Sequence, residues 1–246
     1  MKGKKQMNVY ETLPIKERVE GNSYVGRGIV TGKSANGKNA VFAYFIMGRS
    51  ENSRNRIFVE NGKDVTIYPY DESKVEDPSL IIYSPIRVIG DKVIVTNGDQ
   101  TDTVYDFVSK GDTFENALRT RAFEPDRPNF TPRISAIMEL GEKYTYKMSI
   151  LKSGDAEGTV CNRYFFEYDA IDGLGHFIHT YNCDGNPIPT FTGEPERVVI
   201  PDDIDAFTKE IWENLNENNK ISLYVRYISL KDGTETSRMI NKYKKV

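Results

Sequence analysis

Short runs rich in Val, Ile, Tyr and Phe recur along the chain and are separated by Gly, Asn and other turn residues. Runs of this length and composition are typical of β-strands. In the run at 221–229, Ile221, Leu223 and Val225 alternate with Ser222 and Arg226, a period of two that predicts a half-buried strand. The predicted strands are 24–31, 40–47, 65–68, 86–96, 134–140, 144–151, 160–168, 175–181 and 221–229.

Two other stretches have the spacing of amphipathic helices. The first follows Asp112, which together with Glu115 resembles a capping box with the Asp as the cap. The second follows Asp203 and carries apolar residues at 204, 207, 211 and 215. A weaker helical pattern lies at 71–77, and 126–132 is the most linker-like stretch. Many strands with a few helices predict an α+β fold in which helices cover sheets.

The domain organisation follows from where this patterning begins. Residues 24–246 are expected to form a single domain, since neither an internal repeat nor a long linker interrupts the pattern. Residues 1–23 are polar and weakly patterned, and we interpret them as an N-terminal extension or a loosely attached arm.

Composition excludes several classes of protein. A formal net charge of −3 argues against a uniformly basic nucleic-acid binder. The longest apolar run, at 40–47, is far shorter than the ~20 residues of a membrane-spanning helix, and the start of the chain lacks the apolar stretch of a secretory signal. Cys161 and Cys183 are too few for a disulfide framework and are interpreted as small buried hydrophobes. We therefore expect a cytoplasmic globular protein without nucleic-acid or membrane partners.

Several motifs that suggest chemistry do not meet its requirements. In the segment 32–39, Asn39 stands where a phosphate-binding P-loop has Ser or Thr, so a hairpin turn around Asn36-Gly37 is the better interpretation. His176 and His179 lie in an extended segment, where positions three apart point to opposite sides, and we interpret them as structural or surface residues. The sequence thus predicts no metal site and no cofactor.

Four arginines border apolar or Gly-rich strand segments, namely Arg27, Arg49, Arg54 and Arg133. A guanidinium group suits phosphate and carbonyl oxygens, so convergence of these arginines would build an anion site in an acidic protein. The alternative is that they are solvated strand ends and that Asn97-Gly98 is only a turn.

The segments that contain these residues resemble the archaeal-type IMP cyclohydrolase family in order and in spacing. The segments are Tyr24-Val25-Gly26-Arg27, Ala43-Tyr44 with Arg49-Ser50, Thr96-Asn97-Gly98 with Thr101-Asp102, Thr131-Pro132-Arg133-Ile134, and Thr180-Tyr181-Asn182. The resemblance spans about residues 24–230. It implies a four-layer αββα sandwich similar to N-terminal nucleophile hydrolases but without their processed nucleophile. The first 23 residues, the segment 184–195 and the C-terminal tail depart from the compact archaeal members.

The resemblance also implies an activity, which is closure of the formamido ribonucleotide FAICAR to IMP with loss of water, the last step of purine synthesis. The implied catalytic residues are Arg27, Tyr44, Asn97 and Asp102, with Asp102 as a base or orienter. The implied substrate-binding residues are Arg49, Ser50, Arg54, Arg133, Tyr181 and Asn182. We expect a purine ribonucleotide as the ligand and a homo-oligomer as the assembly. Two other functions remain open, a different amide hydrolase on the same fold and a purine-nucleotide binding protein without the chemistry.

Overall fold

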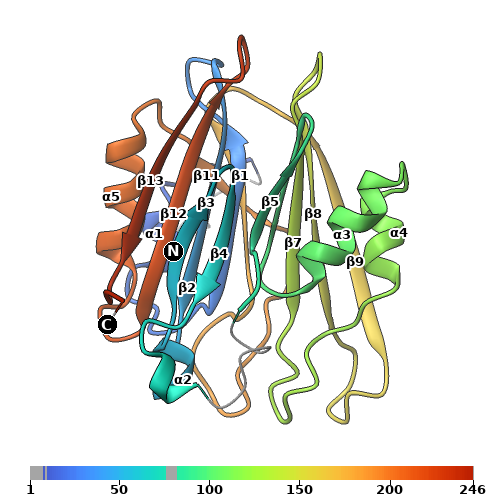
Figure 1. The fold of residues 1–246 in the computed structure, drawn as a ribbon, viewed down its shortest axis with the longest axis vertical. Coiled ribbons are helices and arrows are strands. Elements are labelled where there is room, and N and C mark those ends of the chain that lie inside the picture. Colours follow the sequence, from blue (N-terminus) through green and yellow to red (C-terminus); the bar gives the residue numbers. More distant parts are fainter. Residues whose placement is uncertain (1–7, 9, 76–81, 246) are drawn as a thin grey trace, which may run out of the picture.

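The computed structural model describes residues 8, 10–75 and 82–245, which form two antiparallel sheets that face each other (Figure 1). Sheet A has the strand order β11-β10-β1-β2-β12-β13 and sheet B the order β3-β4-β5-β6-β7-β8-β9. The strands of sheet A are β1 (Arg27–Lys33), β2 (Asn39–Met47), β10 (Leu174–His179), β11 (Glu196–Val199), β12 (Lys220–Ser229) and β13 (Glu235–Asn241). Those of sheet B are β3 (Ile57–Asn61), β4 (Asp64–Tyr68), β5 (Ile86–Ile89), β6 (Lys92–Thr96), β7 (Arg133–Glu139), β8 (Thr145–Ser153) and β9 (Cys161–Asp169).

Helices cover the outer faces of both sheets (Figure 1). α1 (Lys16–Val19) and α5 (Ile204–Asn214) lie on sheet A, whereas α3 (Gln100–Ser109) and α4 (Phe114–Arg119) lie on sheet B. The short α2 (Glu51–Arg54) sits at one end of the sandwich. The protein is therefore α+β, with a helix layer, two sheets and a second helix layer.

Each interface between layers has its own apolar core. Phe42 and Tyr44 of sheet A meet Val95 and Ala136 of sheet B in the core between the sheets. The neighbouring residues of the same strands point the other way, so the outer face of sheet A packs against Phe207 and its neighbours on α5. This alternation follows from the period of two along a strand. It explains why several strands are buried on both faces.

The structure corrects the predicted extent or cap of several elements. Residues 86–96 form two strands rather than one, because Gly90 has a positive φ of 57° and turns the chain between β5 and β6. Thr113, not Asp112, caps α4 by accepting a hydrogen bond from Asn116 N. The predicted helix at 71–77 reduces to a 3₁₀ turn at Glu72–Lys74, and positions 76–77 lie outside the described residues.

The burial expected of the cysteines is also wrong. Cys161 is half-buried at the start of β9, and Cys183 is exposed in the loop that follows β10. Neither side chain belongs to the fully buried core, since both lie at the ends of strands or beyond them.

The residues before the predicted domain contact the sheets. Ile15 and Val19 are buried in the core between sheet A and α5. Leu13 forms a parallel bridge with Val198 of β11. Apolar burial and strand pairing therefore fix residues 13–19 to the fold. For these residues the interpretation as a loosely attached arm is wrong.

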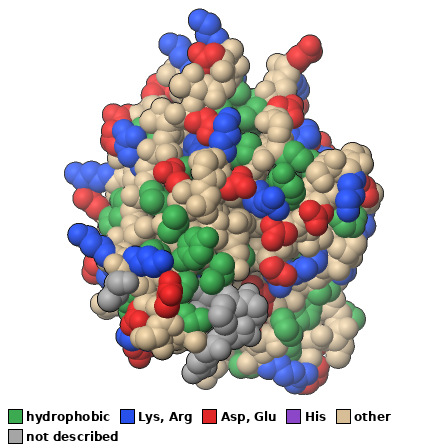
Figure 2. Space-filling model, in the orientation of Figure 1, with side chains coloured by type: hydrophobic (Ala, Val, Ile, Leu, Met, Phe, Trp, Pro, Cys, Tyr) green, Lys and Arg blue, Asp and Glu red, His purple; other side chains and the backbone are tan. Residues whose placement is uncertain are grey.

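Two further features are the distribution of charge on the surface and the length of the helices. Side chains of both charges intersperse on the face shown in Figure 2. Among the described residues, no helix is both long and apolar enough to cross a membrane.

Candidate functional site

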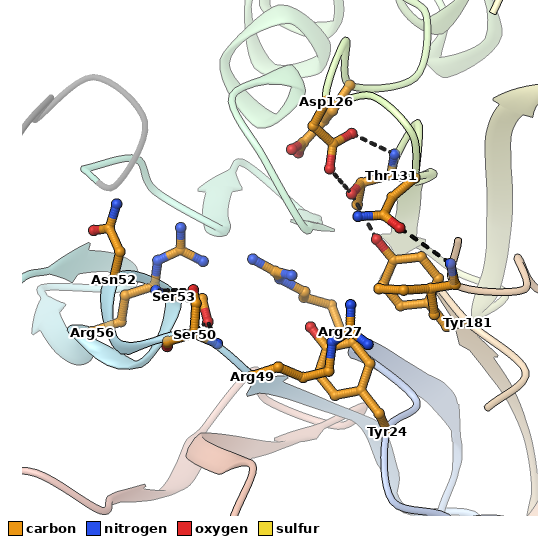
Figure 3. A pocket seen from close by; sticks show the side chains of 13 residues that line it. Tyr24, Arg27, Arg49, Ser50, Asn52, Ser53, Arg56, Asp126, Thr131 and Tyr181 are labelled. Atoms are coloured by element: carbon orange, nitrogen blue, oxygen red, sulfur yellow. Dashed lines mark hydrogen bonds between the residues drawn. The ribbon is translucent and has the colours of Figure 1, made fainter. Parts of the chain in front are cut away.

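A cavity of about 570 Å³ lies at the end of the sandwich where β1 begins and β2 ends (Figure 3). Its volume is within the usual range for small-molecule sites. It is lined by Tyr24, Arg27, Arg49, Ser50, Asn52, Ser53, Arg56, Glu124, Asp126, Asn129, Thr131, Tyr181 and Ile188. These residues come from segments next to both sheets, so the cavity depends on the complete sandwich.

The strand register of sheet A brings distant segments to this end. β1 pairs with β2 through Arg27 and Ile46, so the residues that follow β2 lie beside the start of β1. β10 pairs with the other edge of β1 through His179 and Gly28, which brings Tyr181 beside Tyr24. The rings of Tyr24 and Tyr181 stack with centroids 5.6 Å apart.

Gly26 makes this close approach possible. Its φ is +79°, and a Cβ atom there would lie 2.0 Å from Thr180 Oγ1 and 2.6 Å from the Tyr181 ring. A residue with a side chain fits neither the backbone conformation nor the space. β1 consequently begins at Arg27 rather than at residue 24, and Arg27 takes its place at the edge of the cavity.

Three arginines, Arg27, Arg49 and Arg56, surround the same space in Figure 3. Arg27 Nε is enclosed and has no hydrogen-bond partner in the described part of the chain. Burial opposes the charge of Arg27, yet Tyr24, Tyr83 and Glu124 raise its pKa above the ordinary value. Burial and then the nearby charge of Arg27 lower the pKa of Arg56. Two guanidinium groups that line one cavity and act on each other electrostatically favour the binding of an anion there.

Arg49 is held at the edge of the cavity by the loop that follows β10. Its Nη1 donates to Asp184 Oδ1 and, at 2.9 Å, to the Gly185 carbonyl oxygen. Its guanidinium carbon lies 5.1 Å from the centroid of the Tyr24 ring, which is within the range of a cation–π contact. Arg49 therefore joins the aromatic pair to the loop.

A hydrogen-bonded chain forms the facing wall (Figure 3). Thr131 donates from its backbone N to Asp126 Oδ1 at 2.6 Å and from its hydroxyl to Asp126 Oδ2. Because that hydroxyl proton is used, Tyr181 Oη donates to Thr131 Oγ1, 2.6 Å away. These three hydrogen bonds fix the phenol of Tyr181 relative to the loop 124–131.

Glu124 is a half-buried carboxyl group in the cavity wall. Its backbone N donates to the Thr131 carbonyl at 2.9 Å, which closes the loop. Burial raises the pKa of Glu124, against the opposing effect of Arg27 and Arg133. A carboxyl group whose pKa is raised keeps its proton to a higher pH than an ordinary Glu side chain does. A shifted pKa in a cavity wall marks Glu124 as a candidate general acid or base.

The structure places four of the predicted site residues in the cavity wall, namely Arg27, Arg49, Ser50 and Tyr181. Three others lie behind the wall. Tyr44 Oη is 3.5 Å from Tyr83 Oη, and Tyr83 in turn donates to the Asn97 carbonyl at 2.9 Å. The Asn97 side chain accepts from Ile134 N and donates to the Pro132 carbonyl, while Arg133 forms a 2.6 Å ion pair with Asp99.

The remaining three predicted residues have their side chains bonded elsewhere. Arg54 donates to the Gly48 carbonyl and to Asn219 Oδ1, both at 3.0 Å. Asp102 on α3 forms a 2.9 Å ion pair with Arg87, and Asn182 Nδ2 donates to Thr192 Oγ1 at 3.2 Å. None of these three side chains lines the cavity as the structure describes it.

Sequence reasoning did not select Arg56, Glu124 or Asp126. Arg56 directly precedes the strand β3, so it borders an apolar segment as the four predicted arginines do. Glu124 and Asp126 lie in or next to the stretch interpreted as linker-like. Polar loops lack a periodic pattern, so only the fold reveals that this loop faces the cavity.

The two histidines are buried on opposite faces of β10, so of the two predicted alternatives they are structural rather than surface residues. His176 Nδ1 is 2.7 Å from Tyr146 Oη, whereas His179 Nδ1 is 2.8 Å from the Tyr181 carbonyl oxygen. Within the described ranges, no three His, Cys, Asp or Glu side chains gather in a way that would hold a metal ion.

The cavity combines three guanidinium groups, two stacked phenols and a carboxyl group whose pKa is raised. A site of this class suits a polar, anionic small molecule. Comparison with known proteins identifies the family. A model of IMP cyclohydrolase-like proteins matches residues 24–233, and the chain belongs to this family.

Relatives from three organisms are each named IMP cyclohydrolase. The protein of Methanopyrus kandleri is 31% identical, and the match covers 68% of this chain and 89% of the relative. That of Methanocaldococcus jannaschii is 30% identical over 72% of this chain and 83% of the relative. That of Methanococcus aeolicus is 29% identical over 65% of this chain and 75% of the relative.

Proposed function

We propose that this chain is an IMP cyclohydrolase, which closes FAICAR to IMP with loss of water. The observation that carries this function is the family match over 24–233, within which the motif residues Arg27, Arg49, Ser50 and Tyr181 line one cavity. A purine ribonucleotide is an anionic, polar and partly aromatic ligand. It therefore matches the guanidinium groups and the stacked phenols of this site.

The positions of the arginines suggest how the nucleotide lies. Arg49 and Ser50 stand at the edge of the cavity and bind the phosphate. The phenols of Tyr24 and Tyr181 lie next to them and contact the ribose or the base. Arg27, beside Glu124, receives the reacting carbonyl group.

Ring closure requires the carboxamide nitrogen to attack the formyl carbon. Holding the two groups at attack distance is worth about 7–11 kcal/mol. The new N–C bond turns the formyl oxygen into an oxyanion, for which a donor such as Arg27 contributes about 3–4 kcal/mol. The C–O bond then breaks, and the water that leaves carries the formyl oxygen with one proton from each of the two nitrogens.

Glu124 is our candidate for the proton transfer to the departing oxygen, since it lines the cavity and its pKa is raised by burial. We assign this role to Glu124 rather than to Asp102, because Asp102 is paired with Arg87. Tyr44 and Asn97 act from behind the wall through Tyr83.

The other predicted site residues have supporting roles in this proposal. Arg133 supports the wall through its ion pair with Asp99. Arg54 and Asn182 hold the adjoining loops through the hydrogen bonds described above.

The proposal extends to the rest of the molecule. We take residues 24–246 as one domain whose four layers support a likeness to N-terminal nucleophile hydrolases. The chain would act in the cytoplasm as a homo-oligomer without a cofactor, as the sequence leads us to expect.

The test is an ultraviolet assay of the purified chain with FAICAR in the presence of EDTA. Formation of IMP at a rate proportional to enzyme concentration supports the proposal and shows that the reaction needs no added metal. Binding of IMP without any conversion of FAICAR would identify a nucleotide-binding protein instead. A covalent adduct with an electrophilic substrate mimic would identify a different amide hydrolase.

A further inference from the structure

Residues 10–23, which we call the strap, precede the part of the chain that matches the family yet are built into the fold. Leu13 N donates to the Arg197 carbonyl, and Val199 N donates to the Leu13 carbonyl. Ile15 and Val19 are almost completely buried against sheet A and α5. The strap is therefore fixed at two points before it reaches the cavity.

Asn22, at the end of the strap, bridges two parts of the cavity edge. Its Oδ1 accepts from Tyr24 N at 3.1 Å, and its Nδ2 donates to the Asn182 carbonyl oxygen at 2.8 Å. Tyr24 lines the cavity, and Asn182 directly follows Tyr181, whose ring stacks on that of Tyr24. This side chain thus joins the two segments that carry the stacked rings, in addition to the backbone hydrogen bond from Tyr181 N to the Val25 carbonyl.

The segment that Asn22 holds also holds Arg49. Two residues beyond Asn182, the Asp184 carboxylate accepts from Arg49 Nη1, and the Gly185 carbonyl accepts from the same nitrogen. Asn182 is fixed on its other side, since its backbone N donates to the Pro189 carbonyl at 2.9 Å. A contact path therefore leads from the strap through the loop to a guanidinium group in the cavity wall.

We propose that Asn22 is a positioning residue for the substrate site: it acts through the Asn182–Gly185 loop to hold Arg49 over Tyr24. This inference rests on the proposed function, in which Arg49 binds the phosphate. Asn22 does not line the cavity, so its effect is on how well the site is arranged before the substrate binds.

The experiment measures kcat and KM for FAICAR in Asn22→Ala, Asn22→Asp and a control, Asn36→Ala. Asn36 also bridges two groups, Ser34 Oγ and Lys38 N, but in the turn at the opposite end of β1. We expect Asn22→Ala to raise KM about three- to tenfold with kcat within about twofold of wild type. Asn22→Asp keeps the acceptor for Tyr24 N and loses the donor to Asn182, so it separates the two bonds.

A double-mutant cycle with Arg49→Ala distinguishes positioning from a general loss of stability. If Asn22 acts through Arg49, Asn22→Ala changes KM by less than about 1.5-fold in the Arg49→Ala background. A KM for Asn22→Ala equal to that of the Asn36→Ala control overturns the inference, as does an effect that is fully additive with Arg49→Ala. Absence of turnover in the wild-type chain would instead count against the proposed function, and the same variants would then be compared by their affinity for IMP.

Discussion

The acid stability of the fold is set in part by His176, which is 6% exposed between the two sheets. Its ring stacks on Tyr168 with centroids 3.7 Å apart, and Tyr146 Oη lies 2.7 Å from its Nδ1. Burial, and then the nearby charge of Arg197, lowers the pKa of His176 from 6.5 to about 4. The burial of Tyr146 raises the pKa of its phenol, which stays protonated and donates to Nδ1.

The sign and size of the effect follow from this shift. Because the folded-state pKa lies below the unfolded one, the unfolded chain binds more protons between those two values, and stability falls as the pH falls through this window. A shift from 6.5 to about 4 corresponds to a full loss of about 3 kcal/mol, reached below the folded-state pKa. Between about pH 7 and about pH 5 the loss is about 2 kcal/mol.

The assay is urea unfolding of wild type and His176→Gln near pH 7 and near pH 5. The variant has a lower stability at both pH values, since it loses the stacked ring, but it lacks this proton linkage. We expect wild type to lose about 2 kcal/mol more than the variant over that interval. Equal losses in the two proteins would refute the assignment of this linkage to His176.

Three further predictions concern the cavity. Arg27→Ala lowers turnover at least about tenfold, while the circular dichroism spectrum stays that of the folded wild type. If both Arg27→Ala and Arg49→Ala had wild-type kinetics, neither arginine would belong to the substrate site. Glu124→Gln lowers kcat about 100-fold, because the amide cannot transfer the proton. The profile of kcat against pH also loses the step that the carboxyl group causes. An unchanged profile would assign the proton transfer to another group. Gly26→Ala lowers the free energy of unfolding by about 2 kcal/mol or more because the new Cβ meets Thr180 Oγ1, and an unchanged melting temperature would contradict this.

The sequence predicts strands well where one or both faces are buried. β12 and β2 are both predicted as strands from the sequence. The prediction that the strand at 221–229 is half-buried is wrong, because β12 is buried on both faces between the two cores. The strands that the pattern misses include β11 and β13, which lie at the two edges of sheet A and mix charged with apolar residues. Edge strands bury less surface, so their sequences carry a weaker pattern.

The site is predictable from sequence to the extent that it lies on strand ends. Arg27 and Tyr181 adjoin buried strands, and their neighbours identify them. Glu124 comes from a loop whose conformation depends on the contact between its backbone and Thr131. The sequence predicts Asp102 to be a site residue because it lies in a motif segment. In the structure its side chain points from α3 to Arg87, with which it forms an ion pair. Proximity in a motif does not determine which way a side chain points.

The electrostatics of the cavity support a binding function independently of the family match. Arg27 is half-buried, and its Nε is enclosed without a partner among the residues described. Burial, and then the charge of Arg27, lower the pKa of the neighbouring Arg56. An arrangement selected only for stability would keep two like charges apart, since bringing them together away from water is costly. The cost is offset when an anion enters the cavity, because its charge balances the two guanidinium groups. Local arrangements that cost stability are expected at functional sites. The pair of guanidinium groups of Arg27 and Arg56 is such an arrangement in the wall of this cavity.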